Sequence, residues 1–183
     1  YSIYTWGNST RLGGTGSGQT TANRSYATPM ILPPMASGVT PKMIGMTASG
    51  SGKTYYLLAS DKRLYSLGNN SSRQLGNGNT TNNNTPVQVG TATNWESVSS
   101  KGLNVMARRT NGTLWVWGDN QYGQSGNGTT SDILTPTQLG TATNWQILVA
   151  GYGNSHAIKT DGTLWAWGRN TDGALGDGTT ITR

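Results

Sequence analysis

The sequence predicts an all-β fold, a partial β-propeller of about three and a half four-stranded blades. Segments of the chain recur at a pitch of 50 residues, which is typical of repeat proteins. Each recurring unit holds short alternating stretches bounded by turn residues, a pattern that indicates strands. Gly, Thr, Asn and Ser supply about half of the 183 residues, and this composition favours turns and strands over long helices. The 7 Trp and 8 Tyr argue against the alternative of a disordered chain.

The period is clearest in the second half of the chain. Residues 111–130 and 161–180 share 12 identities over 20 positions, and segment 90–95 recurs unchanged as 140–145. A fainter copy at 4–7 lies 61 residues before the matching Gly68 segment, so the first unit carries 11 extra residues within 8–50. We therefore treat 1–183 as part of one propeller domain. Its repeat units are a divergent one at 1–52, two at 53–102 and 103–152, and an incomplete one at 153–183.

Each unit contains a predicted hairpin. Asn111-Gly112 and Asp161-Gly162 lie between alternating stretches, and both dipeptides tolerate the positive φ angles of a two-residue type I′ turn. The arms of the second hairpin are 157–159 and 164–167. Because successive side chains of a strand point to opposite faces, the two tryptophans of 164–167 are expected to share one face.

The rest of the unit follows the hairpin. A glycine-rich loop such as 173–180 comes first, and an extended stretch such as 135–139 comes next. Pro136 within that stretch suits an edge strand, because proline cannot donate to a ladder. The strand expected at 145–149 completes the unit. Four strands per repeat are the content of one propeller blade.

These elements resemble the regulator of chromosome condensation repeat family. The resemblance lies in the Asp-Gly-Thr-Leu-Trp-x-Trp-Gly-x-Asn core from Asp161, the Gly-x-Leu-Gly-x-Gly-Thr-Thr loop from Gly173 and the Pro136-x-Gln138 strand. It covers about 53–183 well and 1–52 weakly. It implies a seven-bladed propeller, and the near-identity of neighbouring repeats looks like the bacterial and bacteriophage members. The histidine usual in the family's repeat is replaced here by Thr54, Asn104 and Asn154.

Composition excludes several classes of function. Cysteine is absent, which excludes disulfides, thiolate metal sites and a cysteine nucleophile. No apolar stretch approaches the roughly 18–20 residues of a transmembrane helix, so no membrane partner is expected. The net charge is +6, but the basic residues are scattered, with adjacent pairs only at Lys62-Arg63 and Arg108-Arg109. Nucleic acid is therefore not an expected partner.

Candidate catalytic and cofactor groups fit structural roles better. Asp161 has Asn111 as its counterpart and Asp177 has Asn127, and such exchange indicates turn chemistry, since asparagine cannot carry a proton. His156 has no second ligand at metal-binding spacing. The glycine-rich stretches lack the Lys-Ser/Thr end of a phosphate loop. We therefore expect no enzyme activity, no metal and no cofactor.

The tryptophans are expected to pack in the core. Trp117 and Trp167 share a repeat position with Leu67, and leucine replaces tryptophan more readily in a core than in a platform for stacking sugars or bases. We expect polar loops to supply partners for the buried indole N–H groups. The same packing role is expected for Trp6, Trp95, Trp115, Trp145, Trp165, Tyr4 and Tyr65.

Positions that vary between repeats are the candidate partner contacts. The loops after the Trp-x-Trp-Gly strands vary most, and they should gather at one rim of the propeller, where a rigid scaffold usually displays recognition residues. Arg108 departs from its apolar counterparts Leu58 and Ile158, so it either extends to solvent at the ring surface or faces a partner. The candidates are Gln121, Tyr122, Arg169, Asp172 and Arg108.

The sequence thus predicts a non-enzymatic propeller scaffold for protein–protein contact. We expect a structural or surface-displayed protein of a bacteriophage virion or a bacterium, placed outside the cell or on the virion. The alternatives are a lectin-like binder of glycans and a soluble inhibitor or exchange-factor-like regulator. The chain begins with Tyr1 and ends at a similar phase of the repeat, as expected for a fragment or processed chain. Further sequence or a second copy is expected to complete the ring.

Overall fold

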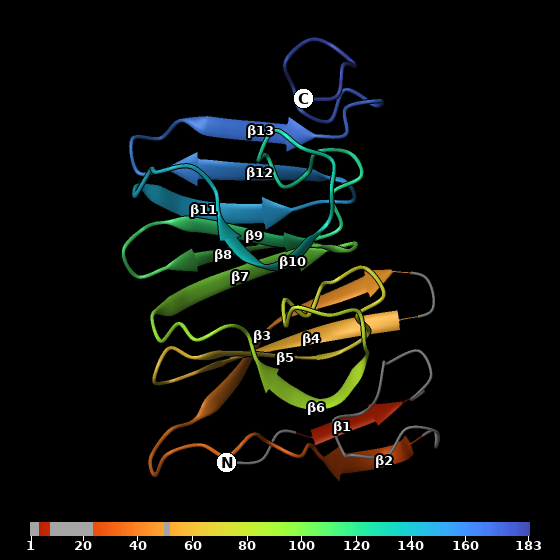
Figure 1. Ribbon diagram of the computed structural model, residues 1–183, viewed down its shortest axis with the longest axis vertical. Coiled ribbons are helices and arrows are strands. Elements are labelled where there is room, and N and C mark those ends of the chain that lie inside the picture. The colour runs from red at the N-terminus through yellow and green to blue at the C-terminus, as the bar shows by residue number, and fades with distance from the viewer. Residues whose placement is uncertain (1–3, 8–23, 50–51) are drawn as a thin grey trace.

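The computed structural model describes residues 4–7, 24–49 and 52–183, and every regular element in these ranges is a β-strand (Figure 1). Alternating apolar residues and glycine-rich turns therefore produce an all-β fold, as predicted. The strands are β1 (Tyr4–Gly7), β2 (Arg24–Pro29), β3 (Pro41–Ser49), β4 (Gly52–Ala59), β5 (Leu64–Gly68), β6 (Asn83–Gln88), β7 (Trp95–Lys101), β8 (Asn104–Arg109), β9 (Leu114–Gly118), β10 (Ile133–Gln138), β11 (Trp145–Ala150), β12 (Asn154–Lys159) and β13 (Leu164–Gly168).

The strands form antiparallel sheets in chain order. The first sheet is β3-β4-β5-β6, the second is β7-β8-β9-β10, and the third is β11-β12-β13. A two-stranded sheet, β1-β2, precedes them. The sheets follow one another along the long axis of the molecule (Figure 1), as the blades of a partial propeller do. The two complete predicted repeat units, 53–102 and 103–152, each hold three strands of one sheet and the first strand of the next sheet.

Two apolar cores join the sheets face to face. Between the first and second sheets, Tyr56 and Val89 pack with Trp95 and Trp117. Between the second and third sheets, Met106, Leu114 and Val116 pack with Trp145, Ala157 and Trp167. Full burial of each large apolar side chain contributes about 1.5–3 kcal/mol, so contacts between sheets supply much of the stability.

The hairpin turns differ from the predicted two-residue type I′ turn. In the third sheet, the Lys159 N–H donates to Thr163 O at 3.0 Å, and the Gly162 N–H donates to Lys159 O at 2.9 Å. The loop therefore has three residues, and within it only Gly162 has a positive φ, of 83°. Asp161 instead accepts from the Thr163 N–H at 2.9 Å, a local bond that fixes the turn. The prediction was wrong because the side-chain bond and the bulge at glycine replace the tighter turn.

The fourth strand of each complete sheet lies at its edge. β10 pairs only with β9 among the described strands, which confirms the edge position predicted from Pro136. Ile133 lies opposite Gly118, and Asn83 lies opposite Gly68 in the first sheet. The repeated register shows that the loops before β6 and β10 return the chain to the same place on each sheet.

Most tryptophans pack as predicted, with two corrections. Trp95 and Trp117 are buried, and the Nε1 groups of Trp117 and Trp167 donate at 2.9 Å to the backbone oxygens of Gln74 and Gln124. Trp145 is also buried, but the Nε1 atoms of Trp95 and Trp145 have no hydrogen-bond partner, contrary to expectation.

The expected burial was wrong for two other aromatic residues. Trp165 is 49% exposed and Tyr4 is 50% exposed. Trp165 lies on the same face of the third sheet as Trp167, but no described strand runs along the outer side of β13 to cover it. Tyr4 lies on β1, near the opposite end of the stack (Figure 1). Lys159 instead covers the Trp165 ring at 4.1 Å, a cation–π contact. The predicted packing of the Trp6 side chain lies outside what the structure describes.

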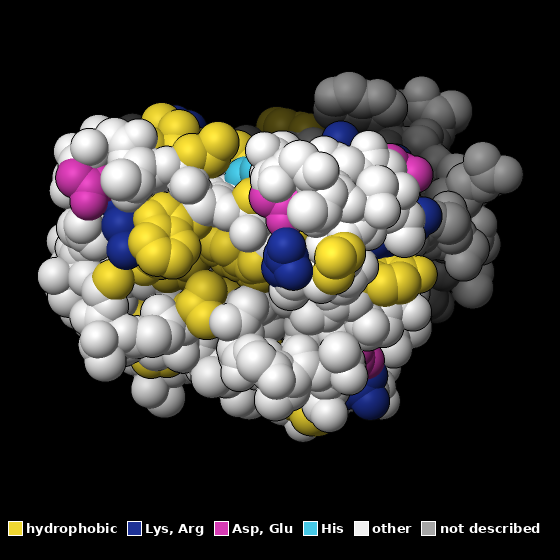
Figure 2. Space-filling view, turned by 90° about the horizontal axis from the view of Figure 1, so that it is seen from above, with side chains coloured by type: hydrophobic (Ala, Val, Ile, Leu, Met, Phe, Trp, Pro, Cys, Tyr) yellow, Lys and Arg dark blue, Asp and Glu magenta, His cyan; other side chains and the backbone are white. Residues whose placement is uncertain are grey.

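The third sheet carries an uncovered apolar face. Cross-strand pairing places Ile147 with Ile158 and Leu164, and Val149 with His156. Ile147, Val149 and Leu164 are 48–65% exposed. Figure 2, viewed from this end of the molecule, shows hydrophobic side chains gathered around a hollow. The matching face of the second sheet is buried against the third sheet. Within the described ranges, no helix is present that could cross a bilayer.

Candidate functional site

Three glycine-rich loops follow β5, β9 and β13, at 69–82, 119–132 and 169–182, and we call them together the loop rim. They lie on the same side of the stacked sheets (Figure 1). Direct contacts connect them: the Gly78 N–H donates to Leu134 O at 3.0 Å, just beyond the second loop. The Arg73 guanidinium also pairs with the Asp132 carboxylate between the first and second loops. The three loops therefore gather on one side of the sheets (Figure 1), as predicted, and the first two are in direct contact.

A buried asparagine holds each loop of the rim in shape. In the second loop, Asn120 is fully buried, and its Nδ2 donates to Thr129 O at 2.9 Å and Ser131 O at 3.0 Å. Its Oδ1 accepts from the Ser125 N–H at 2.9 Å. These bonds satisfy backbone groups that the loop removes from water. The same arrangement surrounds Asn70 and Asn170, which are also fully buried.

Seven residues after each buried asparagine stands Asn77, Asn127 or Asp177. Each accepts from the buried asparagine's Nδ2, at 3.0, 3.3 and 3.1 Å. Hydrogen bonds from the Thr179 side chain and backbone lower the pKa of Asp177 to about 2. The Asp177 carboxylate therefore accepts the same hydrogen bond as the amide oxygens of Asn77 and Asn127, which agrees with the expected structural role of this residue in the turn.

Glutamines connect the loops to the next sheet. Gln124 Oε1 accepts from the Tyr122 N–H at 2.8 Å, and its Nε2 donates to Asp119 at 2.8 Å. Its backbone oxygen accepts from Trp167 Nε1 of the third sheet. Gln74 makes the same set of contacts with Ser72, Asn69 and Trp117. The shape of each loop is therefore coupled to the packing between two sheets.

Three of the predicted contact residues meet in one small pocket. Gln121, Tyr122 and Arg169 line a pocket of about 210 Å³ between the second and third loops. The Arg169 guanidinium lies 5.5 Å from the centre of the Tyr122 ring. Such a cation–π contact fixes the position of both side chains while leaving them partly exposed. Tyr122 is 38% exposed.

The pocket also contains residues that the sequence reasoning missed. Tyr152, in the turn between β11 and β12, and Asp119 complete its wall. Burial raises the pKa of Asp119, while a hydrogen bond from Gln121 lowers it. A comparison of repeats would have indicated Tyr152, because its counterpart one period earlier is Gly102.

The other two predicted residues lie elsewhere. Asp172 is exposed at the third loop and does not line the pocket. Arg108 lies between the second and third sheets, where its Nη2 is 3.0 Å from Glu96 Oε2. Its Nη1 donates to Trp145 O at 3.3 Å. Arg108 therefore contacts Glu96 of the second sheet and Trp145 of the third sheet and does not line the pocket of the loop rim.

Replacing Arg108 by leucine should change the free energy of unfolding by less than about 1 kcal/mol. The part-exposed pair with Glu96 contributes little, and loss of the Trp145 contact is offset by removing the buried, unpartnered Nε of Arg108. Urea denaturation followed by tryptophan fluorescence measures the change. A loss above about 2 kcal/mol would show that Arg108 stabilises the sheet junction.

The histidine and the turn carboxylates of the described residues take part in local hydrogen bonds. The described residues contain no group of three or more His, Asp or Glu side chains able to hold a metal ion. His156 lies within the third sheet, with Nε2 3.0 Å from Ala174 O. The acidic residues of the turns, such as Asp161, are engaged by neighbouring threonines.

Comparison with known protein families gives one consistent match. The model of the regulator of chromosome condensation (RCC1) repeat matches residues 61–100, 111–158 and 161–183. A second model of the same repeat matches residues 95–124. No curated protein matches the chain as a relative.

Solved structures match the fold. Human WBSCR16 is 20% identical, with a TM-score of 0.76 over 98% of this chain and 45% of that one. Yeast RCC1 (Prp20) bound to Kap60 is 18% identical, with a TM-score of 0.72 over 99% of this chain and 43% of that one. Prp20p from Saccharomyces cerevisiae, described with its binding to Gsp1p and histones, is 19% identical, with a TM-score of 0.74 over 97% of this chain and 43% of that one. This chain therefore spans less than half the length of each.

Proposed function

Because this chain belongs to the regulator of chromosome condensation (RCC1) repeat family, whose fold serves as a protein-interaction scaffold, we propose that it binds a protein partner through the loop rim. One observation carries the proposal. Identical buried asparagines hold all three loops, whereas the exposed Gln121 and Tyr122 and the half-buried Arg169 have different counterparts in the other repeats. A fixed backbone that displays variable side chains is the arrangement used for recognition.

The chemistry of the pocket supports a protein as the partner. Tyr122 and Arg169 belong to the residue types most enriched at binding hot spots. The yeast Prp20 structures are described with protein partners, which supports the same class of ligand here. In this proposal the chain has no enzymatic role, and its part is to bind and position.

A paired-variant binding experiment tests the proposal. The 183-residue chain is used as bait in extracts of its source cells, beside Tyr122→Ala/Arg169→Ala and a control, Thr91→Ala/Thr93→Ala, whose exposed threonines lie in the 89–94 segment between β6 and β7. We expect a protein that wild type and control enrich equally and that the rim variant enriches at least about tenfold less. If both variants retain every enriched protein, or both lose it, the loop rim is not the binding surface.

The composition supports a narrower role, which we also propose: a structural or surface-displayed protein of a bacteriophage virion or bacterium, outside the cell or on the particle. Low charge, no cysteine and similar repeats are the features that favour it. Mass spectrometry of purified particles and of cell fractions tests it. Recovery only from the cytosolic fraction would contradict the placement.

We propose further that another sheet of the same repeat type covers the apolar face of the third sheet. The support is that the matching face of the second sheet packs against the third through Met106 and Leu114. Exposed apolar surface of this kind favours association. Sedimentation of the 183-residue chain should therefore show self-association, and a stable, well-folded monomer would count against it.

A further inference from the structure

One repeat position at the start of each rim loop changes its charge along the chain. It is Asn69 in the first loop, Asp119 in the second and Arg169 in the third. The backbone at this position is the same in all three repeats, because its N–H donates at 2.8–3.1 Å to a backbone oxygen of the same sheet, that of Lys53, Leu103 or Gly153. The three side chains therefore start from equivalent places, and only their chemistry differs.

In the first two loops this side chain accepts a hydrogen bond that holds its own loop. A glutamine five residues later donates to it at 2.7–2.8 Å, Gln74 to Asn69 and Gln124 to Asp119. The third loop has neither partner of this bond, because arginine cannot accept a hydrogen bond and the glutamine is replaced by Ala174. The side chain of Arg169 therefore does not hold its loop as its counterparts do.

Arg169 contacts the second loop instead. Its guanidinium lies 5.5 Å from the centre of the Tyr122 ring, and its Nε donates to Thr171 Oγ1 at 2.9 Å. Among the described residues, no acceptor receives a hydrogen bond from its two terminal nitrogens, and no carboxylate forms an ion pair with it. Four other arginines do pair with a carboxylate: Arg63, Arg73, Arg108 and Arg183.

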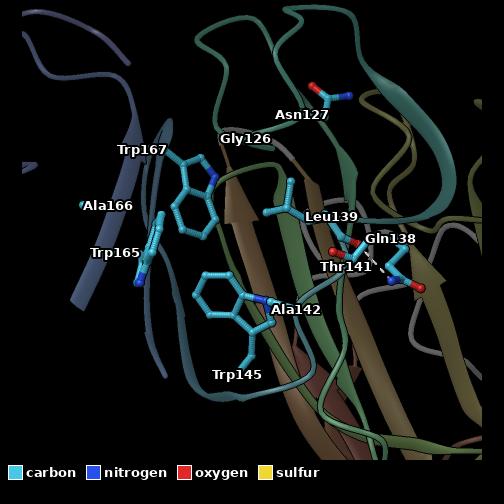
Figure 3. A pocket seen from close by; sticks show the side chains of 11 residues that line it. Gly126, Asn127, Gln138, Leu139, Thr141, Ala142, Trp145, Trp165, Ala166 and Trp167 are labelled. Atoms are coloured by element: carbon cyan, nitrogen blue, oxygen red, sulfur yellow. Dashed lines mark hydrogen bonds between the residues drawn. The ribbon is translucent and has the colours of Figure 1, made fainter. Parts of the chain in front are cut away.

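The walls around Arg169 are held by close packing. Tyr122 lies so near Gly153 that a Cβ added to this glycine would be 2.9 Å from the ring. Trp167 of the third sheet lies beside Gly126 of the second loop (Figure 3), where an added Cβ would be 2.7 Å from the indole Nε1. The second loop is therefore fixed against the third sheet, and the pocket of about 210 Å³ is preformed.

The pocket contains one negative group, the carboxylate of Asp119. Its Oδ2 accepts from the side-chain amides of Gln121 at 3.2 Å and of Gln124 at 2.8 Å. The charge of Asp119 is thus met by two donors of its own loop, whereas no described acceptor meets the terminal nitrogens of Arg169. An anionic ligand therefore gains more from Arg169 than it loses to Asp119, and the planar guanidinium suits the two oxygens of a carboxylate.

We infer that this pocket receives the carboxylate of an aspartate or glutamate side chain of the partner protein. The terminal nitrogens of Arg169 donate to the carboxylate oxygens, and the rings of Tyr122 and Tyr152 form the adjoining walls. The inference rests on the proposed function, because it names the group that the loop rim recognises. A side chain is the source of the carboxylate, since a folded protein surface presents many acidic side chains and only one chain end.

Three short peptides test the inference by NMR titration of the isotope-labelled 183-residue chain. Acetyl-Gly-Glu-Gly-amide carries a side-chain carboxylate only, acetyl-Gly-Gln-Gly-amide carries none, and acetyl-Gly-Gly-Gly carries only a C-terminal one. We expect the glutamate peptide to shift the signals of the Arg169 Nε–H and the Gly153 N–H in a saturable way. The glutamine peptide should bind at least about fivefold more weakly, and the C-terminal peptide should also bind more weakly.

Three variants locate the charge that is recognised. Arg169→Gln should abolish saturable binding of the glutamate peptide. Asp119→Asn copies Asn69, which accepts the same bond from its glutamine, so it should keep the loop folded and strengthen binding about threefold by removing the like charge. Asp172→Asn is the matched control, because it removes a carboxylate of the rim that does not line the pocket, and it should leave the affinity unchanged.

The inference is overturned if no peptide shows saturable binding, if the glutamate and glutamine peptides bind equally, or if the C-terminal peptide binds most tightly. Weaker binding to Asp119→Asn would also overturn it, because a cationic ligand is then favoured. Its failure differs from failure of the proposed function. The proposed function fails when the Tyr122→Ala/Arg169→Ala variant retains every protein from the extract, whereas this inference fails when that variant loses a partner but the glutamate peptide does not bind.

Discussion

Replacing Gly76 by alanine should lower the free energy of unfolding by about 3 kcal/mol, whereas the same change at Gly176 should cost only about 1 kcal/mol. Both glycines have a left-handed backbone, with φ of 67° and 70°. Both donate the same turn hydrogen bond at 3.1 Å, to Arg73 O and to Gly173 O. The strain of placing a side chain on this backbone is therefore common to the two variants.

The two sites differ in what the added methyl group meets. At Gly76 a Cβ would lie 2.8 Å from Nε1 of Trp117, which is fully buried. At Gly176 nothing lies within 4 Å. Trp117 cannot move away easily, because it also contacts the rings of Tyr56 and Trp95. Urea denaturation of the two variants measures the difference, and equal losses would show that the close approach of loop and tryptophan contributes nothing.

Replacing Asn120 by alanine should lower the free energy of unfolding by about 3–4 kcal/mol. The change leaves the Ser125 N–H and the oxygens of Thr129 and Ser131 without their partner. An unpaired polar group costs about 1–3 kcal/mol when it is buried, as Ser125 is, so the loop should also open locally before the sheets unfold. Denaturation and hydrogen exchange of residues 119–132 measure the two effects.

Asn127→Asp is the matched control for this loop. It keeps an acceptor for Asn120 Nδ2, and the third repeat already has Asp177 at this position. We expect a change within about 0.5 kcal/mol, typical of a surface substitution. A loss in Asn127→Asp as large as that in Asn120→Ala would mean that the buried amide is not what holds the loop.

The pitch of the repeat was sufficient to predict the sheets. The alternation in 164–167 predicted that Trp165 and Trp167 share a face, and both rings contact Trp145 at 6.0–6.2 Å. Pro136 marked an edge strand because its missing N–H excludes a central position. These features are local, so a single repeat contains the information that determines them.

Features that depend on neighbouring sheets were harder to predict. Trp165 has the same local sequence as Trp115, yet Trp165 is the more exposed because no described fourth strand covers it. The role of Asn120 was also missed, since one asparagine among 17 has no distinguishing local signal. The feature of the sequence that could have indicated this role is the recurrence of asparagine at 70 and 170, one period before and after. The pocket could not be predicted in full because one of its lining residues, Tyr152, lies outside the three loops, in the turn between β11 and β12.

Amide hydrogen exchange of the free chain tests most directly whether the rim loops form a fixed scaffold. The N–H groups of Leu75, Ser125 and Leu175 each donate to a buried asparagine Oδ1 at 2.9 Å. We expect these three amides to exchange as slowly as those of the central strand β8, and exposed residues such as Thr130 to exchange rapidly. If all three exchange as fast as Thr130, the loops are not held by the buried amides, and a binding surface preformed by the repeats is contradicted.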